Sequence, residues 1–232
     1  MAGRIGNKLL DLLPEAESKR LLASSQIVSL PVGQIVMQQD GPMPHVYFPT
    51  TSVFGIVLVV EQGKQVEGTT MGTEGMVGLP VFLGVDSHPF RAIVQVSGEA
   101  VRVPATTFAQ VVKTCSTLDR LLRRYTLYRL RCANQTGACN SLHAIEERMC
   151  RWLLMVRDRA GKDEFSLTHD FMAELLGVRR QTVSIIAGTL QRSGLITYRR
   201  GLLRVLDREG LEAASCECYE TLKRLYERII RS

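Results

Sequence analysis

Short apolar runs separated by frequent glycines mark the first half of the chain. Between Ile27 and Val103 these runs are rich in Val, Ile, Thr and Phe, and glycines recur at positions 33, 41, 55, 63, 68, 72, 75, 78, 84 and 98. Short strands joined by many turns are typical of β-sandwiches and barrels. The pattern therefore predicts a β domain, preceded by a short helix from Leu9 to Leu22 in which Pro14 is an interruption or a first-turn residue.

The pattern changes to helical spacing after Pro104. Thr106 to Lys113 predicts a short helix, and Ser116 to Cys139 predicts a long one in which Gly137 is the one glycine and no proline occurs. A further helix is predicted from Ser141 to Arg159, with an apolar side for burial. The second half of the chain is therefore expected to begin with a series of helices.

The long predicted helix carries an apolar stripe in alternating steps of three and four residues. The stripe comprises Leu118, Leu121, Tyr125, Tyr128 and Cys132, and it continues through Gln135 and Cys139. Such a heptad stripe suits a parallel partner helix, so we predict a dimer seam here. The alternative is that this face packs on the helix's own domain.

The segment HDFMAELLGVRRQTVSIIAGTL predicts two helices joined by a tight turn. Thr168 can cap the first helix through its hydroxyl, and the small side chain of Ala173 allows the second helix to approach closely. Gly177 supplies the turn, where a residue with positive φ is needed. The inward side of the second helix is then formed by Val178, Val183, Ile186 and Leu190. This pattern predicts a helix-turn-helix.

The outward side of the second predicted helix carries polar groups near its N-terminal end. Arginine can donate two hydrogen bonds to guanine, glutamine can pair with adenine, and an isoleucine can meet a thymine methyl. We predict DNA base contacts by Arg180, Gln181, Ser184 and Ile185. We predict contacts to the DNA backbone, which set the register, by Thr168, Arg179, Thr182, Arg199 and Arg200.

Two of these backbone contacts belong to a predicted hairpin. The apolar runs that begin at Leu195 and Leu202 flank Arg199-Arg200-Gly201, which gives the hairpin a basic tip and makes it a wing. The alternative for all of these arginines is a solvated helix or hairpin surface.

The charge distribution favours nucleic acid as a partner. The net charge is +6, and Gly177 to Arg204 contains six arginines and no acidic residue. A composition of 45% hydrophobic and 22% charged residues is typical of a soluble globular protein. The longest apolar run, Val53 to Val60, is far shorter than a membrane span, and no signal peptide is recognisable. We therefore expect a cytoplasmic protein with no membrane partner.

The β domain, the long helix and the winged helix-turn-helix with LLGVRRQTVSIIAGTLQRSGLI together resemble the Crp/Fnr family of bacterial transcription regulators. The resemblance extends from about Leu12 to Leu211. It implies an α+β fold with an N-terminal double-stranded β-helix (jelly roll) sensor domain in residues 1–113. A dimerisation helix in 114–139 and a winged helix-turn-helix DNA-binding domain in 140–232 are expected to follow.

The resemblance also implies partners. A homodimer would bind double-stranded DNA at a palindromic operator, respond to a small-molecule effector and contact RNA polymerase. Family members commonly carry an acidic residue and an arginine where this chain has Gln181 and Ile185. The operator sequence is therefore expected to differ from the usual one.

The predicted sensor departs from the cyclic-nucleotide-binding members of the family. Those members use a Gly-Glu pair for the ribose and an Arg-Ser or Arg-Thr pair for the phosphate, whereas the corresponding stretches here are GMVGLPVF and PFRAIVQV. Cyclic nucleotide binding is therefore not expected. The resemblance places a candidate effector pocket at Gly78, Leu79, Arg91 and Asn134. The alternative is a constitutive DNA-binding regulator whose β domain serves dimerisation or protein contacts.

No cofactor, metal or enzymatic activity is expected. No cysteine precedes Cys115 to hold the family's iron–sulfur cluster, and the four histidines are isolated. Cys216-Glu217-Cys218 offers two metal ligands, but without a nearby histidine or second cysteine pair this is a weak site. A thiol switch in which Cys132 or Cys139 faces its own symmetry mate across the predicted seam is a further hypothesis, with buried small hydrophobes as the alternative. No phosphate loop or nucleophile elbow is present.

Overall fold

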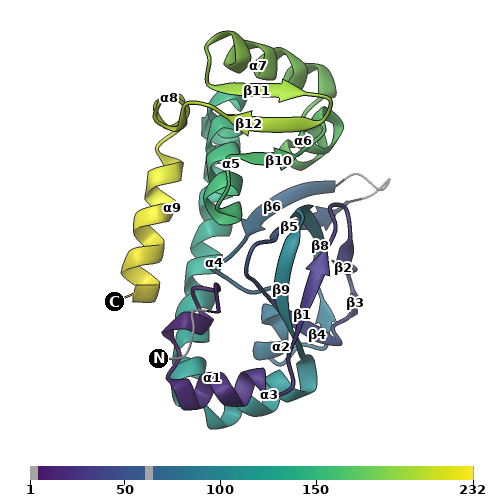
Figure 1. The fold of residues 1–232 in the computed structure, drawn as a ribbon, viewed down its shortest axis with the longest axis vertical. Coiled ribbons are helices and arrows are strands. Elements are labelled where there is room, and N and C mark those ends of the chain that lie inside the picture. Colours follow the sequence, from purple (N-terminus) through teal and green to yellow (C-terminus); the bar gives the residue numbers. More distant parts are fainter. Residues whose placement is uncertain (1–4, 61–64, 232) are drawn as a thin grey trace.

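The computed structural model describes residues 5–60 and 65–231 and shows the predicted mixed α+β fold. Figure 1 shows a β domain on one side of the long helix α4 (Ser116–Leu142) and the C-terminal helix α9 (Cys218–Tyr226) on the other. A small domain of helices and short strands lies at one end of the molecule. Within the described residues, no helix is both long enough and apolar enough to cross a membrane.

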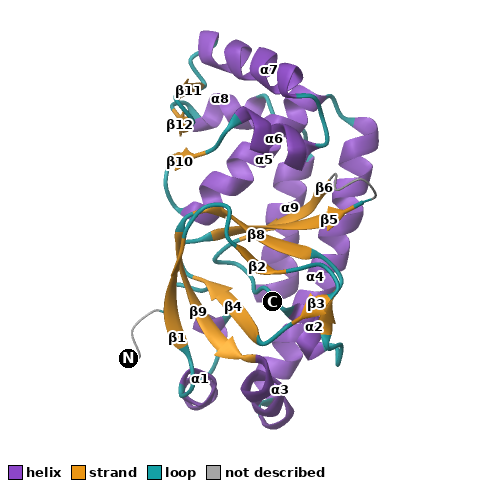
Figure 2. Ribbon diagram, turned by 90° about the vertical axis from the view of Figure 1, so that its right-hand side faces the viewer, coloured by secondary structure: helices purple, strands orange, loops and turns teal. Residues whose placement is uncertain are grey.

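Antiparallel sheets build the β domain (Figure 2). One sheet has the order β1-β9-β4, with β1 (Gln26–Leu30), β9 (Gly98–Pro104) and β4 (His45–Pro49). The other has the order β2-β8-β5-β6, with β2 (Ile35–Met37), β8 (Arg91–Val96), β5 (Val53–Val59) and β6 (Gln65–Met71). A short ribbon pairs β3 (Gly41–Pro42) with β7 (Ser87–His88). The predicted run of short strands and turns is confirmed.

The helices that the sequence pattern predicts before the helix-turn-helix form to within a few residues, whereas the short helix Leu79–Phe82 was not predicted. Pro14 separates the 3-10 turn η1 (Leu10–Leu12) from α1 (Glu15–Leu22), because its fixed φ suits the position just before a helix. The remaining helices are α2 (Leu79–Phe82), α3 (Ala105–Thr114) and α5 (Ile145–Ala160). Helix α5 begins four residues later than predicted because the backbone of His143 and Ala144 is extended, which creates a joint between α4 and α5.

The C-terminal part contains the predicted helix-turn-helix and wing together with elements that the pattern did not predict. The predicted elements are α6 (His169–Leu176), α7 (Arg180–Arg192), β11 (Ile196–Arg199) and β12 (Leu202–Val205). The additional ones are β10 (Glu164–Ser166), α8 (Arg208–Ala213), α9 and the π-helical η3 (Glu227–Arg231). Strand β10 pairs with β12 and completes a three-stranded sheet.

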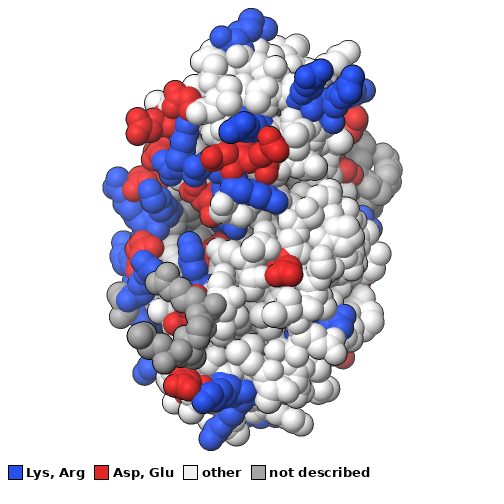
Figure 3. Space-filling model, in the orientation of Figure 1, with Lys and Arg blue, Asp and Glu red and all other residues white. Residues whose placement is uncertain are grey.

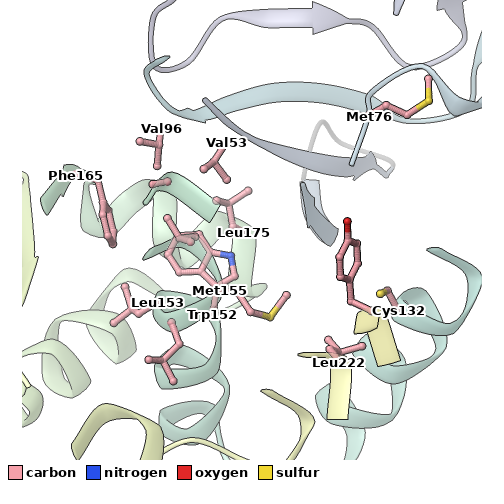
Figure 4. Packing of buried hydrophobic residues seen from close by; sticks show 14 of the residues in the cluster. Val53, Met76, Val96, Cys132, Trp152, Leu153, Met155, Phe165, Leu175 and Leu222 are labelled. Carbon is pink, nitrogen blue, oxygen red and sulfur yellow. The ribbon is translucent and has the colours of Figure 1, made fainter. Parts of the chain in front are cut away.

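One continuous apolar cluster joins the β domain to the C-terminal domain. Figure 4 shows its centre, where Trp152 and Leu153 of α5 lie among side chains from both sides. Val53 and Val96 come from the β domain, and Leu175 comes from α6. Because protein interiors are close-packed and tolerate few voids, such an interface fixes the two domains relative to each other.

The predicted dimer seam on α4 is wrong for this structure, because the stripe is buried inside its own chain. Leu118, Leu121, Tyr125, Tyr128 and Cys132 are between 0% and 6% exposed. The Tyr125 hydroxyl accepts a hydrogen bond from the Met76 backbone N–H at 3.1 Å, and the Tyr128 ring packs edge-on against Tyr226 of α9 at 5.3 Å. The alternative, packing on the helix's own domain, describes this face.

Two buried carboxylates of the β domain reach α5. Glu67 of β6 accepts hydrogen bonds from the indole N–H of Trp152 at 3.3 Å and from the Thr70 hydroxyl. Glu74 forms an ion pair with Arg159 at 2.6 Å, and both side chains are at least 90% buried. Since unpaired buried polar groups are costly, these contacts favour one arrangement of the two domains.

Glu67→Gln should make the stability of the protein less dependent on pH. Burial raises the pKa of Glu67, while its hydrogen bonds from Thr70, Gln95 and Trp152 oppose that rise only in part. The native state therefore holds this proton more tightly than the unfolded chain does. The wild type loses stability as pH rises from the unfolded pKa, about 4.3, through the raised native pKa, and the loss is then constant.

Thermal unfolding of both proteins between pH 4 and pH 9 measures this effect. The melting temperature of Glu67→Gln minus that of the wild type should increase by several degrees across that window and then level off. Glu99→Gln, at an exposed position on β9, is the control and should give a constant difference. A pH-independent difference for Glu67→Gln would contradict the explanation.

Candidate nucleic-acid interface and sensor domain

The helix-turn-helix forms for the local reasons that its sequence indicates. The Thr168 hydroxyl caps α6 by accepting the Phe171 backbone N–H at 3.2 Å. Gly177 ends α6 with φ of +68°, a conformation that costs glycine little. Ala173 of α6 lies in the core, as do Val183, Ile186 and Leu190 of α7, which are at most 7% exposed. Helix α7 is thereby held with one face outward.

That outward face carries the four predicted base-contacting residues. Arg180, Gln181, Ser184 and Ile185 line one shallow hollow on the surface. Arg180 is the first residue of α7, and the side chain of Ile185 is unusually exposed for an isoleucine, at 69%. The structure thus brings these side chains together at the N-terminal half of a protruding helix, where they are free to contact another molecule.

Two residues of α6 support this face, and the sequence analysis did not identify either of them. Asp170 lies 3.4 Å from the Nε atom of Arg180, and both side chains are largely exposed. The Nδ1 atom of His169 is 2.9 Å from the Ser184 hydroxyl, and its ring stacks on Tyr198 of the wing at 4.2 Å. No local spacing in the sequence indicates these contacts, because they join separate elements.

His169 is adapted to a neutral role in this contact. Partial burial, followed by the positive charge of Arg180, lowers the pKa of His169, whereas Asp170 raises it. A lowered pKa keeps the imidazole uncharged at neutral pH, so it can orient the Ser184 hydroxyl without adding charge.

The predicted wing is confirmed as a hairpin. Arg199 of β11 pairs with Leu202 of β12, and the turn residues Arg200 and Gly201 have φ of 51° and 80°. The Leu167 N–H donates to the Gly201 carbonyl at 2.7 Å, which places the wing tip beside Thr168.

Three of the five predicted backbone contacts, Thr168, Arg199 and Arg200, therefore come from adjoining segments. The other two lie in the first turn of α7, where Arg179 is the exposed N-cap and Thr182 is half-buried.

Charge is distributed unevenly over the surface. Figure 3 shows basic side chains at the α7 end of the molecule, whereas basic and acidic side chains alternate along α8 and α9. On α9 and η3, for example, Arg224 pairs with Glu220 and Arg231 pairs with Glu227. On the face that Figure 3 shows, the α7 end is therefore basic, whereas the charges along α8 and α9 largely pair with one another.

The predicted effector residues lie on separate elements. Gly78, with φ of +96°, precedes α2 and packs so closely on Val46 that a Cβ atom there would lie 2.9 Å from a Val46 methyl. Leu79 packs partly buried against the main core, and the Arg91 guanidinium donates to Gln65 at 3.0 Å. Asn134 is exposed on α4. An open groove of about 470 Å³ lies elsewhere, between α5 and α9, and none of the four residues lines it.

Four metal-binding side chains meet at the joint between α4 and α5. The ligand atoms of Cys139, His143, Cys216 and Cys218 all lie within 4.8 Å of one another. The expectation that Cys216 and Cys218 have no neighbouring ligands is wrong, because the fold adds Cys139 and His143. The C-x3-H spacing at the end of the long helix was the available signal. A thiol switch between symmetry mates at Cys132 or Cys139 finds no support, since Cys139 contacts Cys216 and Cys132 lies in the main core of its own chain.

Family models match both parts of the chain. Residues 27–115 match the cyclic nucleotide-binding domain, and residues 147–214 match the Crp-like helix-turn-helix domain. Together the two matches cover more than half of the sequence. Comparison with curated protein sequences finds no significant match.

Solved structures of similar fold cover 83% to 94% of this chain. A transcriptional regulator of the Crp/Fnr family from Eubacterium rectale superposes with a TM-score of 0.67 at 16% identity, covering 94% of this chain and 98% of its own. FixK2 from Bradyrhizobium japonicum gives 0.69 at 18% identity, covering 83% and 98%. The c-di-GMP-responsive global regulator CLP from Xanthomonas campestris gives 0.62 at 16% identity, covering 84% and 100%. With its cyclic nucleotide-binding domain, long helix and Crp-like helix-turn-helix in this order, the chain belongs to the Crp/Fnr family of transcription regulators.

Proposed function

We propose that the protein is a sequence-specific regulator that reads DNA through Arg180 and Gln181. The observation that carries this proposal is the outward hollow formed by the four side chains of α7, beside a basic wing. In helix-turn-helix proteins the N-terminal residues of the second helix contact base edges in the major groove. Arg180 is suited to guanine and Gln181 to adenine, while Arg179, Thr182 and the wing are suited to phosphates.

A homodimer would form through the face of α4 that the chain leaves open. Leu127 and Leu130 are 56% and 60% exposed on this helix. With Asn134, Gly137 and Ser141 they follow one another in steps of three and four residues, two positions after the buried stripe. Two positions correspond to about 200° around a helix, so this is the opposite face. In coiled coils, a single asparagine within a leucine seam fixes the register of the paired helices.

Such a dimer would place two copies of α7 on one DNA duplex. A two-fold axis along paired α4 helices requires an operator with matching symmetry, with half-sites about one helical turn apart. Asn134, the candidate effector contact, then lies on the proposed seam. The contact with RNA polymerase stays a prediction from the family resemblance.

Gating by an effector would act through the contacts between the β domain and α5. Glu67–Trp152 and Glu74–Arg159 connect the β domain to the helix that leads into the helix-turn-helix. We propose that a ligand of the β domain shifts the population between two arrangements of these contacts. An effector that binds two states with different affinities must shift their populations in this way. The alternative is constitutive DNA binding, which is favoured by the filled space beside Gly78 and by Leu79 and Ala92, which stand where cyclic-nucleotide-binding members carry the glutamate and the serine or threonine of their pairs.

Arg180→Ala should weaken operator binding far more than binding to random DNA. Loss of one bidentate contact to guanine costs about 1 to 3 kcal/mol, which is roughly 5- to 150-fold in affinity. Affinities for random DNA should fall by only a few-fold, since one positive charge is lost. The operator is first obtained by selecting bound sequences from a random DNA pool, and titration then gives both affinities.

Arg192→Ala is the matched control for this measurement. Arg192 is an exposed arginine at the C-terminal end of the same helix, away from the hollow. Its replacement removes the same charge and should reduce binding to both DNAs equally. Equal losses for Arg180→Ala would show that Arg180 does not read bases.

Replacing Leu127 and Leu130 together by glutamate should convert the dimer to a monomer. Placing four like charges against each other in one seam opposes association and removes the apolar contact. Sedimentation measurements should give a dimer for the wild type and a monomer for the variant. Ile27→Glu, at a 72% exposed position on β1, should leave the dimer intact. A monomeric wild type or a dimeric variant would refute the proposed seam.

Denaturation and refolding can free the protein of bound small molecules. The refolded protein should then bind the operator at least about tenfold more weakly than protein that holds its effector, because coupling free energies between an effector site and a DNA-binding site are typically of this size. The refolded protein must have the far-ultraviolet circular dichroism spectrum of the original sample. A small-molecule extract of the original sample should restore the affinity. Full affinity without any such extract would favour the constitutive alternative.

A further inference from the structure

Two distant segments bring thiols and an imidazole together at the α4–α5 joint. Cys139 lies in the last turn of α4, and His143 follows α4 directly, so the spacing of four residues puts both side chains on one side. Cys216 and Cys218 lie where α8 leads into α9. The Sγ atoms of Cys139 and Cys216 are 3.5 Å apart, and Cys218 Sγ is 3.7 Å from His143 Nδ1.

These separations fit the edges of a tetrahedral zinc site. Zinc binds cysteine sulfur at about 2.3 Å and histidine nitrogen at about 2.0 to 2.1 Å, so tetrahedral ligand atoms lie about 3.5 to 3.8 Å apart. A set of three cysteines and one histidine is a common structural zinc site. All three cysteines are free thiols and at most 4% exposed, as expected for a closed site.

The surroundings of the four side chains orient them as metal ligands. Glu217 lies 3.1 Å from His143 Nε2, so the proton of a neutral imidazole belongs on Nε2 and the lone pair of Nδ1 faces the sulfurs. A carboxylate behind a ligating histidine is typical of zinc sites. The Gln135 side-chain N–H donates to Cys218 Sγ at 2.9 Å, which suits a sulfur carrying negative charge.

Positive charge is also present beside the cluster, on the buried Arg151 and the half-buried Arg148. The guanidinium groups of Arg148 and Arg151 interact electrostatically with Cys139 and repel each other. Within the described residues the Nε atoms of both have no hydrogen-bond partner. Three thiolates with one divalent cation carry a net negative charge, which would offset these arginines.

We propose that Cys139, His143, Cys216 and Cys218 bind a zinc ion. The ion would fasten the C-terminal extension to the end of α4, so that α9 stays packed along that helix and the joint to α5 keeps its extended shape. This proposal does not depend on the proposed DNA sequence reading or on the dimer seam, since every ligand comes from one chain.

The test is metal analysis of the full-length protein purified without chelator. Elemental analysis should give about one zinc per chain, and replacing zinc by Co²⁺ should give the visible absorption of a tetrahedral thiolate site. Cys218→Ser should lower the zinc content about tenfold or more. Cys150→Ser, at a buried cysteine outside the cluster, should leave it unchanged.

Glu217→Gln keeps the proposal testable if the cysteine variants fail to fold. Glu217 is largely exposed, so its replacement should leave folding intact while zinc affinity, measured by competition with a chelator, falls about 10- to 100-fold. Glu220→Gln is the control and should have no effect. A metal-free wild type that takes up no Co²⁺, a Cys139–Cys216 disulfide found by mass spectrometry, or bound iron with sulfide would each overturn the proposal.

Discussion

The buried stripe of α4 packs against the β domain on one side and against α9 and η3 on the other. Tyr125 reaches the backbone of Met76, and Tyr128 packs against Tyr226. Fully burying a large apolar side chain stabilises a fold by about 1.5 to 3 kcal/mol. The stripe is therefore substantial beside a typical net stability of about 5 to 15 kcal/mol. Because this face is occupied, the opposite face with Leu127 and Leu130 remains open.

The same helix leads directly into α5, through which the two domains contact each other. Trp152 of α5 is both part of the apolar core and a hydrogen-bond donor to buried Glu67, while Arg159 at the end of α5 pairs with Glu74. Each contact is buried, so breaking it without replacement is costly. A rearrangement of β6 would therefore change the contacts that hold α5 in place. This coupling is a physical basis on which a ligand of the β domain can act.

The helix-turn-helix shows how a rigid scaffold leaves a few side chains free. Its inward residues are buried, and Gly177 and Thr168 define the turn and the first cap. What remains outside is a compact group that includes Arg180 and Ile185, steadied by Asp170 and His169. Side chains fixed in this way lose less conformational freedom on binding, which favours specific contacts.

The sequence by itself determined the features that depend on neighbouring residues. Strand and helix periodicity, the cap at Thr168 and the positive-φ turn at Gly177 were predictable because they arise within a few residues of chain. The outward group on α7 followed from the same helical spacing.

Only the tertiary structure decided what covers each apolar face and which distant residues meet. Helical periodicity shows that α4 has an apolar stripe, but a stripe can pack on its own domain or on a partner, and α9 settled that choice. The cluster of Cys139, His143, Cys216 and Cys218 joins segments 77 residues apart. Contacts of that range depend on the path of the whole chain, and no local pattern encodes them.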